Sequence, residues 1–153
     1  MPSERLTAIT LDERSTGGGG QLDLERTRAI ADLLDENSFA PAGLKGPYGL
    51  HLSTRESRLL FTLTPPAPAP KHKITLPLQP LRGTIRDYFL LCESYQEAVK
   101  QGGAARIEAV DMGRRGLHNE GAEQLTSLLA GKIAVDFNTA RRLFTLICVL
   151  HMK

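Results

Sequence analysis

Residues of the kind that bind ligands or move protons are concentrated in one ten-residue segment of the chain. The segment runs from Asp111 to Glu120 and is interrupted by glycines at positions 113 and 116. Its polar members are Asp111, Arg114, Arg115, His118, Asn119 and Glu120. Arginine binds carboxylates and phosphates through paired hydrogen bonds, and histidine titrates near neutral pH. The segment therefore predicts a site for an anion or, as an alternative, a site of proton transfer.

A second pair of arginines, Arg141 and Arg142, stands near the start of the last predicted helix. We expect these two to face the same cleft as the first segment, which would gather several guanidinium groups. Such a group suits an anionic small molecule or an acidic patch on a partner protein. Our leading hypothesis is a non-catalytic binding or regulatory module. Its predicted binding surface consists of Asp111, Arg114, Arg115, His118, Asn119, Glu120, Arg141 and Arg142.

The alternative is an enzyme of the hydrolase or phosphoryl-handling type that uses His118 and Glu120 for acid–base chemistry. No G-x-S-x-G nucleophile turn is present, no P-C-x-x-C follows the His-x-Glu pair, and no zinc-ligand spacing is found. We therefore assign no catalytic residue, metal or cofactor. A plainer interpretation makes Asp111 and Arg115 a surface ion pair worth only about 0.3–0.5 kcal/mol, with His118 an incidental polar residue.

The local structure of this segment can be read in two ways. Gly113 and Gly116 each lower helix propensity by up to about 1 kcal/mol relative to alanine. We favour a break at Gly116, which would make Asn119 the N-cap of a second helix whose backbone amides face an anion. A continuous helix would instead place Asp111, Arg115 and His118 on one face.

The N-terminal half of the chain predicts strands and one helix. The helix is expected from Asp23, as N-cap, to about Asn37, as left-handed cap, because its apolar residues form one stripe. Alternating apolar residues predict strands at 6–11, 48–52, 59–63 and 73–76, the second and third joined as a hairpin and the last at a sheet edge. Residues 39–41 are expected in a loop, and flexible loops are expected near 14–21 and 65–71.

The C-terminal half predicts helices. A helical spacing, which predicts one buried face, is followed by Leu81, Ile85, Tyr88, Cys92, Tyr95 and Val99. Gly102 and Gly103 are expected to end this helix. A short strand is expected at 133–135. The last helix, capped by Asn138 or Thr139, is apolar on nearly every side and should be buried. The fold class we predict is α+β, with a small antiparallel sheet packed against three to four helices in a single domain over 1–153.

Composition limits the classes of partner. The chain has 153 residues, 24% charged, with a formal net charge of only +2 and no tryptophan. We therefore do not expect nucleic-acid binding. The longest apolar run, 146–150, is far shorter than the roughly 20 residues of a membrane span, and no signal peptide is visible. We expect a cytoplasmic protein whose two cysteines, Cys92 and Cys148, are buried free thiols.

Several stretches of the chain resemble one known family. They are Ile107 to Gly121 (IEAVDMGRRGLHNEG), Thr139 to His151 (TARRLFTLICVLH), Glu36 to Pro41, Tyr48 to Ser53 and Arg86 to Tyr95. Together they make the chain similar, over nearly its whole length, to the UPF0262 family of small bacterial proteins. The resemblance implies a bacterial, cytoplasmic, single-domain protein. It carries no activity, cofactor or catalytic residue.

Overall fold

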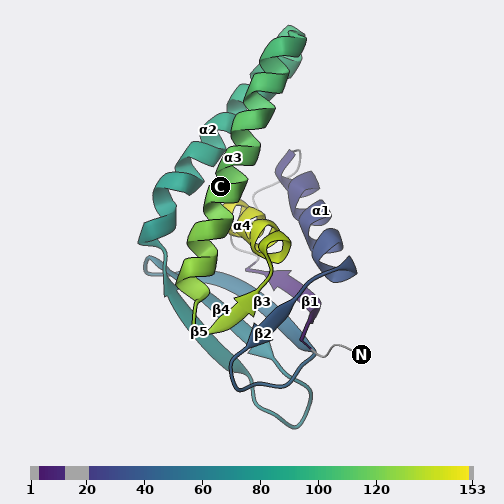
Figure 1. Cartoon of the computed structure of the whole chain (residues 1–153), viewed down its shortest axis with the longest axis vertical. Coiled ribbons are helices and arrows are strands. Elements are labelled where there is room, and N and C mark those ends of the chain that lie inside the picture. The colour runs from purple at the N-terminus through teal and green to yellow at the C-terminus, as the bar shows by residue number, and fades with distance from the viewer. Residues whose placement is uncertain (1–3, 13–20, 152–153) are drawn as a thin grey trace.

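The computed structural model describes residues 4–12 and 21–151. In it, helices cover one face of a four-stranded sheet, and two long neighbouring helices extend well beyond the layer that packs on the sheet (Figure 1). The hydrophobic core joins the covered face of the sheet to the helices above it. The α+β fold class is confirmed.

The main sheet contains β1 (Leu6–Leu11), β3 (Tyr48–Arg55), β4 (Arg58–Thr64) and β5 (His72–Pro77), in the order β1-β3-β4-β5. The strand pairs β3–β4 and β4–β5 are antiparallel, and β5 lies at the edge as predicted. Strand β1 runs parallel to β3, so the sheet is mixed rather than wholly antiparallel. Alternate residues of β3, β4 and β5 are buried, as expected for a sheet with one covered face.

The predicted hairpin is present with longer strands than expected. Glu56 and Ser57 form its two-residue turn with φ angles of 51° and 65°. Positive φ at both turn positions is the geometry whose twist matches two paired antiparallel strands. Residues 53–55, which we expected in the turn, therefore continue the ladder of β3.

The stretch that we expected as a loop at 39–41 is a strand. It is β2 (Phe39–Pro41), and it pairs antiparallel with β6 (Ile133–Val135), a strand that was predicted. Phe39 is completely buried. The loop prediction was wrong because the partner that makes this segment a strand lies more than 90 residues away along the chain.

Helix α1 (Gln21–Asp35) begins before Asp23, so the predicted N-cap lies inside the helix. Asn37 was also wrongly predicted as a left-handed cap, since its φ is not among the positive ones. Its side-chain oxygen instead accepts a hydrogen bond from the Leu6 N–H at 2.7 Å. Its side-chain nitrogen donates to the Leu6 carbonyl at 3.0 Å and to the Leu33 carbonyl at 2.6 Å. These bonds tie the end of α1 to β1. The loop expected near 14–21 falls almost entirely on residues 13–20, which lie outside the described part of the chain.

Helices α2 (Gln79–Gln101) and α3 (Ala104–Leu129) form the long pair in Figure 1. Helix α2 ends at Gly102, whose φ of 76° is left-handed, as predicted for a glycine stop. The first four residues of the predicted apolar face are buried, whereas Val99 is 50% exposed. The face is buried only where α2 lies over the body of the protein. Both cysteines are buried free thiols, as expected.

Helix α3 is continuous over 26 residues, so the predicted break at Gly116 was wrong. Asn119 lies inside the helix, and it neither caps a helix nor exposes backbone amides to an anion. The helix packs along α2 and α4. Burial against those two helices outweighs the helix-propensity loss of about 1 kcal/mol for each glycine.

Helix α4 (Phe137–His151) is the buried C-terminal helix that the sequence predicts. Its fully or almost fully buried apolar residues are Leu143, Phe144, Leu146, Ile147, Cys148, Val149 and Leu150. The predicted caps were wrong, because the Asp136 carboxylate accepts the backbone N–H of Thr139 at 2.9 Å and so caps the helix. No helix in the described ranges, 4–12 and 21–151, is long and apolar enough to cross a bilayer.

Candidate functional site

A recess of about 310 Å³ lies where α1, α3 and α4 meet. Its residues with polar or charged side chains are Glu25, Arg28 and Asp32 from α1, Arg114 and His118 from α3, and Asn138, Arg141, Arg142 and Thr145 from α4. Four arginines and two carboxylates give the lining a formal charge of +2, the same as that of the entire chain. The positive charge of the molecule is therefore locally concentrated here.

A close approach of α3 to α4 positions the α3 side of the recess. An added Cβ at Gly121 would lie only 2.5 Å from ring atoms of Phe144, so a glycine is needed at this contact. Arg114 and His118 precede Gly121 by seven and three residues, which places all three on one face of the helix. The glycine contact thus directs the arginine and the histidine toward α4.

His118 is held as a neutral imidazole. Its Nε2 lies 2.9 Å from the Thr145 hydroxyl oxygen, and its ring packs against Tyr88 at a centroid distance of 4.8 Å. Burial, followed by the charges of Arg141 and Arg114, lowers the His118 pKa to about 4. At neutral pH the ring therefore carries no charge and provides hydrogen bonds without acting as a general acid.

Arg114 is fixed from several sides. Its guanidinium lies over the Tyr95 ring at 4.6 Å from the centroid and donates to Asp111 at 3.4 Å. Only 19% of its side chain is exposed, compared with 64% for Arg115. Cys92 lies in the same surroundings, and burial, with the nearby Glu25 charge, raises the pKa of its thiol to about 11. The thiol is therefore protonated at neutral pH and is a poor nucleophile.

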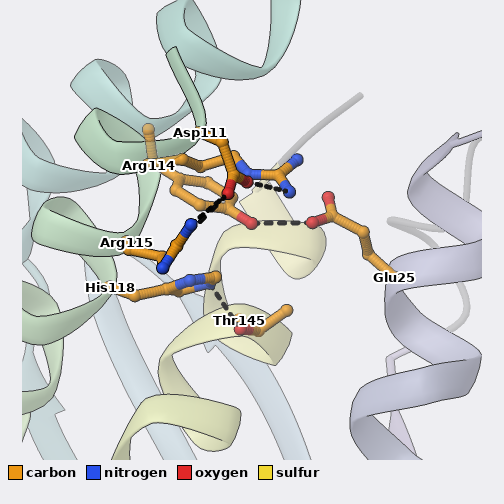
Figure 2. Close-up of polar contacts among 7 residues, drawn as sticks. Glu25, Asp111, Arg114, Arg115, His118 and Thr145 are labelled. Atoms are coloured by element: carbon orange, nitrogen blue, oxygen red, sulfur yellow. Dashed lines mark hydrogen bonds and ion pairs between the residues drawn. The ribbon is translucent and has the colours of Figure 1, made fainter. Parts of the chain in front are cut away.

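A buried tyrosine joins the α1 side of the recess to α2. The Tyr88 hydroxyl donates to Glu25 Oε1 at 2.7 Å. Burial and the Glu25 charge raise the pKa of Tyr88 far above its usual range. Figure 2 shows Glu25 reaching from α1 toward Arg114 and His118, with Thr145 below the imidazole. The carboxylate thus stands opposite the cationic side chains.

The two arginines of α4 have few partners within the protein. The Nε atom of Arg141 is buried and has no hydrogen-bond partner; among the described residues only Arg5 shares this condition, and Arg5 does not line the recess. Arg142 makes one long hydrogen bond, 3.4 Å from Nη1 to the carbonyl of Glu36. Both guanidinium groups therefore retain donors for a ligand.

Half of the predicted binding set lies outside the recess: Asp111, Arg115, Asn119 and Glu120. Asp111 and Arg115 form a surface ion pair at 2.7 Å, and the Arg115 hydrogen bond lowers the pKa of Asp111. Glu120 accepts a hydrogen bond from Thr84 on α2 at 3.3 Å. It is two residues from His118, which is about 200° around a helix, so the two side chains diverge.

The α1 side of the recess was missed by sequence reasoning, as were Asn138 and Thr145. Glu25, Arg28 and Asp32 are spaced by three and four residues, so they share one face of α1. That spacing could have been used to predict a polar stripe on the helix. The spacing does not indicate that this stripe faces α4, because the packing of α1 on α4 joins segments more than 100 residues apart.

A larger hollow, of about 740 Å³, lies on the uncovered face of the sheet. A row of residues, each paired with the next, crosses the four strands of the main sheet: Thr10, His51, Thr62 and Lys73. Its lining includes two basic residues, Arg55 and Lys73, and two acidic ones, so its charges balance apart from His51. The hollow therefore lacks the concentrated charge of the recess. In neither place does the described part of the chain bring together three potential metal-ligating side chains.

Comparison with known proteins identifies relatives over the whole chain. The model of a family described as an uncharacterised protein family, UPF0262, matches residues 3–153. A "UPF0262 protein" of Brucella anthropi is 52% identical over 155 residues, covering 100% of this chain and 97% of the relative. One of Xanthobacter autotrophicus is 50% identical, covering 99% and 94%. No solved structure matches the chain.

Proposed function

The chain belongs to the UPF0262 family of uncharacterised proteins, and we propose that it is a non-catalytic binding module whose recess holds a small anion. The observation that carries this proposal is the convergence of Arg114, Arg141 and Arg142 on one recess, with a buried donor of Arg141 left unpaired. A buried donor without a partner costs about 1–3 kcal/mol. A carboxylate or phosphate oxygen bound in the recess would pair with the guanidinium groups that line it and place a negative charge beside this donor.

The state of the polar groups supports binding rather than catalysis. His118 is neutral, with a pKa of about 4, and its Nε2 is engaged with Thr145. The thiol of Cys92 is protonated. The enzyme alternative needs His118 and Glu120 to act on one substrate, but Glu120 contacts α2 and does not line the recess. No observation therefore favours the enzyme alternative.

The shape of the site favours a small anion over an acidic protein surface. The arginines line a recess between helices, whereas a flat acidic partner would need charges displayed on the outside. Arg115, the arginine that is displayed outward, is already paired with Asp111. A recess of about 310 Å³ is at the lower end of the range for small-molecule pockets.

The test is thermal unfolding in inorganic phosphate at constant ionic strength. We expect phosphate to raise the Tm of the wild type by about 5–10 °C at a hundredfold excess over Kd, since such binding adds about 2.7 kcal/mol. Arg141→Gln should weaken phosphate binding by about 10- to 100-fold, the effect of losing one charged hydrogen bond. Arg115→Gln is the matched control and should bind as the wild type does. Equal loss in both variants, or no shift in the wild type, would rule out the recess as an anion site.

A further inference from the structure

The recess has two walls of opposite formal charge. On α1, Glu25 and Asp32 are seven residues apart on one face with Arg28 between them, so this wall carries a formal charge of −1. Arg114, Arg141 and Arg142, from α3 and α4, give the other wall a formal charge of +3. Opposite charges that meet in proteins pair at about 2.7–2.9 Å. Among the residues that the structure describes, no ion pair within 4 Å joins these α1 carboxylates to these arginines. The two walls therefore face each other across the recess without closing on each other.

The α1 wall is held in place by a contact that leaves most of its acceptor positions free. Tyr88 donates one hydrogen bond to Glu25 Oε1, and a carboxylate has about four acceptor positions. The α1 wall is therefore anchored and still able to accept hydrogen bonds. On the other wall the Arg141 Nε–H is unpaired. A simple anion would satisfy the arginines but would leave the carboxylates facing an added negative charge.

We infer that the recess binds a small zwitterionic molecule, with its carboxylate or phosphate on the arginines and its ammonium group on Glu25 and Asp32. This inference rests on the proposed function and adds the chemistry of the ligand's second end. A ligand of this type bridges the two walls and satisfies both. It also explains why two carboxylates line a recess whose net charge is positive.

Matched probes test the inference by calorimetric titration. L-Aspartate has an ammonium group where succinate has a hydrogen atom, and phosphoethanolamine has one where propyl phosphate has a methyl group. The two pairs distinguish a carboxylate ligand from a phosphate ligand. We expect at least one zwitterion to bind about tenfold or more tightly than its partner without nitrogen. Equal affinity within both pairs would overturn the inference and leave the anion site standing. Failure of all four probes and of inorganic phosphate would overturn both.

Variants of the α1 wall test whether its carboxylates cause the preference for a zwitterion. Asp32→Asn removes a charge from an exposed side chain, and Glu25→Gln keeps an acceptor for Tyr88. Each should reduce the preference for the zwitterion to within about threefold of parity, because the ammonium group loses its counter-charge. Asp35→Asn, also exposed on α1 but outside the recess, should keep the full preference. A preference that survives both Asp32→Asn and Glu25→Gln would overturn the inference.

Discussion

On helix α3, Arg114 and His118 lie against α4 and line the recess, whereas their immediate neighbours Arg115 and Asn119 lie on the side open to solvent. The two faces carry similar polar residues, but their surroundings differ. On the inner face a buried imidazole has a depressed pKa and an arginine stacks on a tyrosine. On the outer face Arg115 makes a surface ion pair of the kind worth at most about 0.5 kcal/mol.

The difference shows that helical phase, not residue type, decides which charges belong to a site. One position along a helix turns a side chain by about 100°, which is enough to move it from a recess to solvent. The glycines of α3 also differ between the inner and the outer face. Gly121 allows the close contact with Phe144, whereas a Cβ at Gly116 would meet nothing within 4 Å. Substitutions at matched positions on the two faces test this division.

The largest expected effect is the loss of stability in acid that is caused by protonation of His118. Its folded-state pKa, about 4, is below the unfolded value of about 6.5, so the unfolded chain takes up the proton first as pH falls. Stability is therefore lost between about pH 6.5 and pH 4, by about 3 kcal/mol at pH 4. Urea unfolding followed by circular dichroism should show this loss in the wild type and in a His72→Gln control but not in His118→Gln. Identical pH profiles for wild type and His118→Gln would contradict the described environment of the ring.

The next effect concerns the contact between α3 and α4. Gly121→Ala should destabilise the protein by about 1–3 kcal/mol, because its methyl group overlaps the Phe144 ring in a packed core. The same substitution should weaken phosphate binding, since separating the helices moves Arg114 and His118 away from Arg141. Urea unfolding and a phosphate titration measure the two effects. Full stability in Gly121→Ala would show that the helices do not approach as closely as described.

The smallest effect has the opposite sign. Gly116→Ala should stabilise the protein by up to about 1 kcal/mol, because alanine favours a helix and its methyl group meets only solvent. Phosphate binding should be unchanged. Comparison of urea midpoints for wild type and variant gives the sign directly. Destabilisation by Gly116→Ala would favour the broken helix that the sequence suggested over the continuous α3.

The sequence was sufficient for the parts of the fold that depend on local pattern. Alternation of apolar residues predicts the strands β3 and β4. A glycine predicts the left-handed end of α2, and an apolar surface on nearly every side predicts that α4 is buried. Strand β2 was missed because its partner β6 lies more than 90 residues away along the chain. The favoured break in α3 was wrong because the continuity of this helix depends on tertiary packing against α2 and α4. Local propensity at Gly116 favours a break, and packing along α2 and α4 reverses that preference.

The candidate site could be predicted only in part, for the same reason. Both arginine pairs were recognised, and three of their four members line the recess, with His118. Arg115 was included because residue type alone cannot separate it from Arg114 without the phase of the helix. Glu25 and Asp32 were missed because nothing local indicates that α1 packs on α4. These two carboxylates are also the residues that suggest the second end of the ligand.

The most direct test of the inner face as the binding face uses the wild-type protein alone. Inorganic phosphate is titrated into the ¹⁵N-labelled protein at constant ionic strength, and the arginine Nε–H resonances are followed by NMR. We predict that the Arg141 Nε–H resonance shifts and saturates with a single Kd, while that of Arg115 does not saturate. Saturation at Arg115 with no change at Arg141 would show that the inner face is not the binding face.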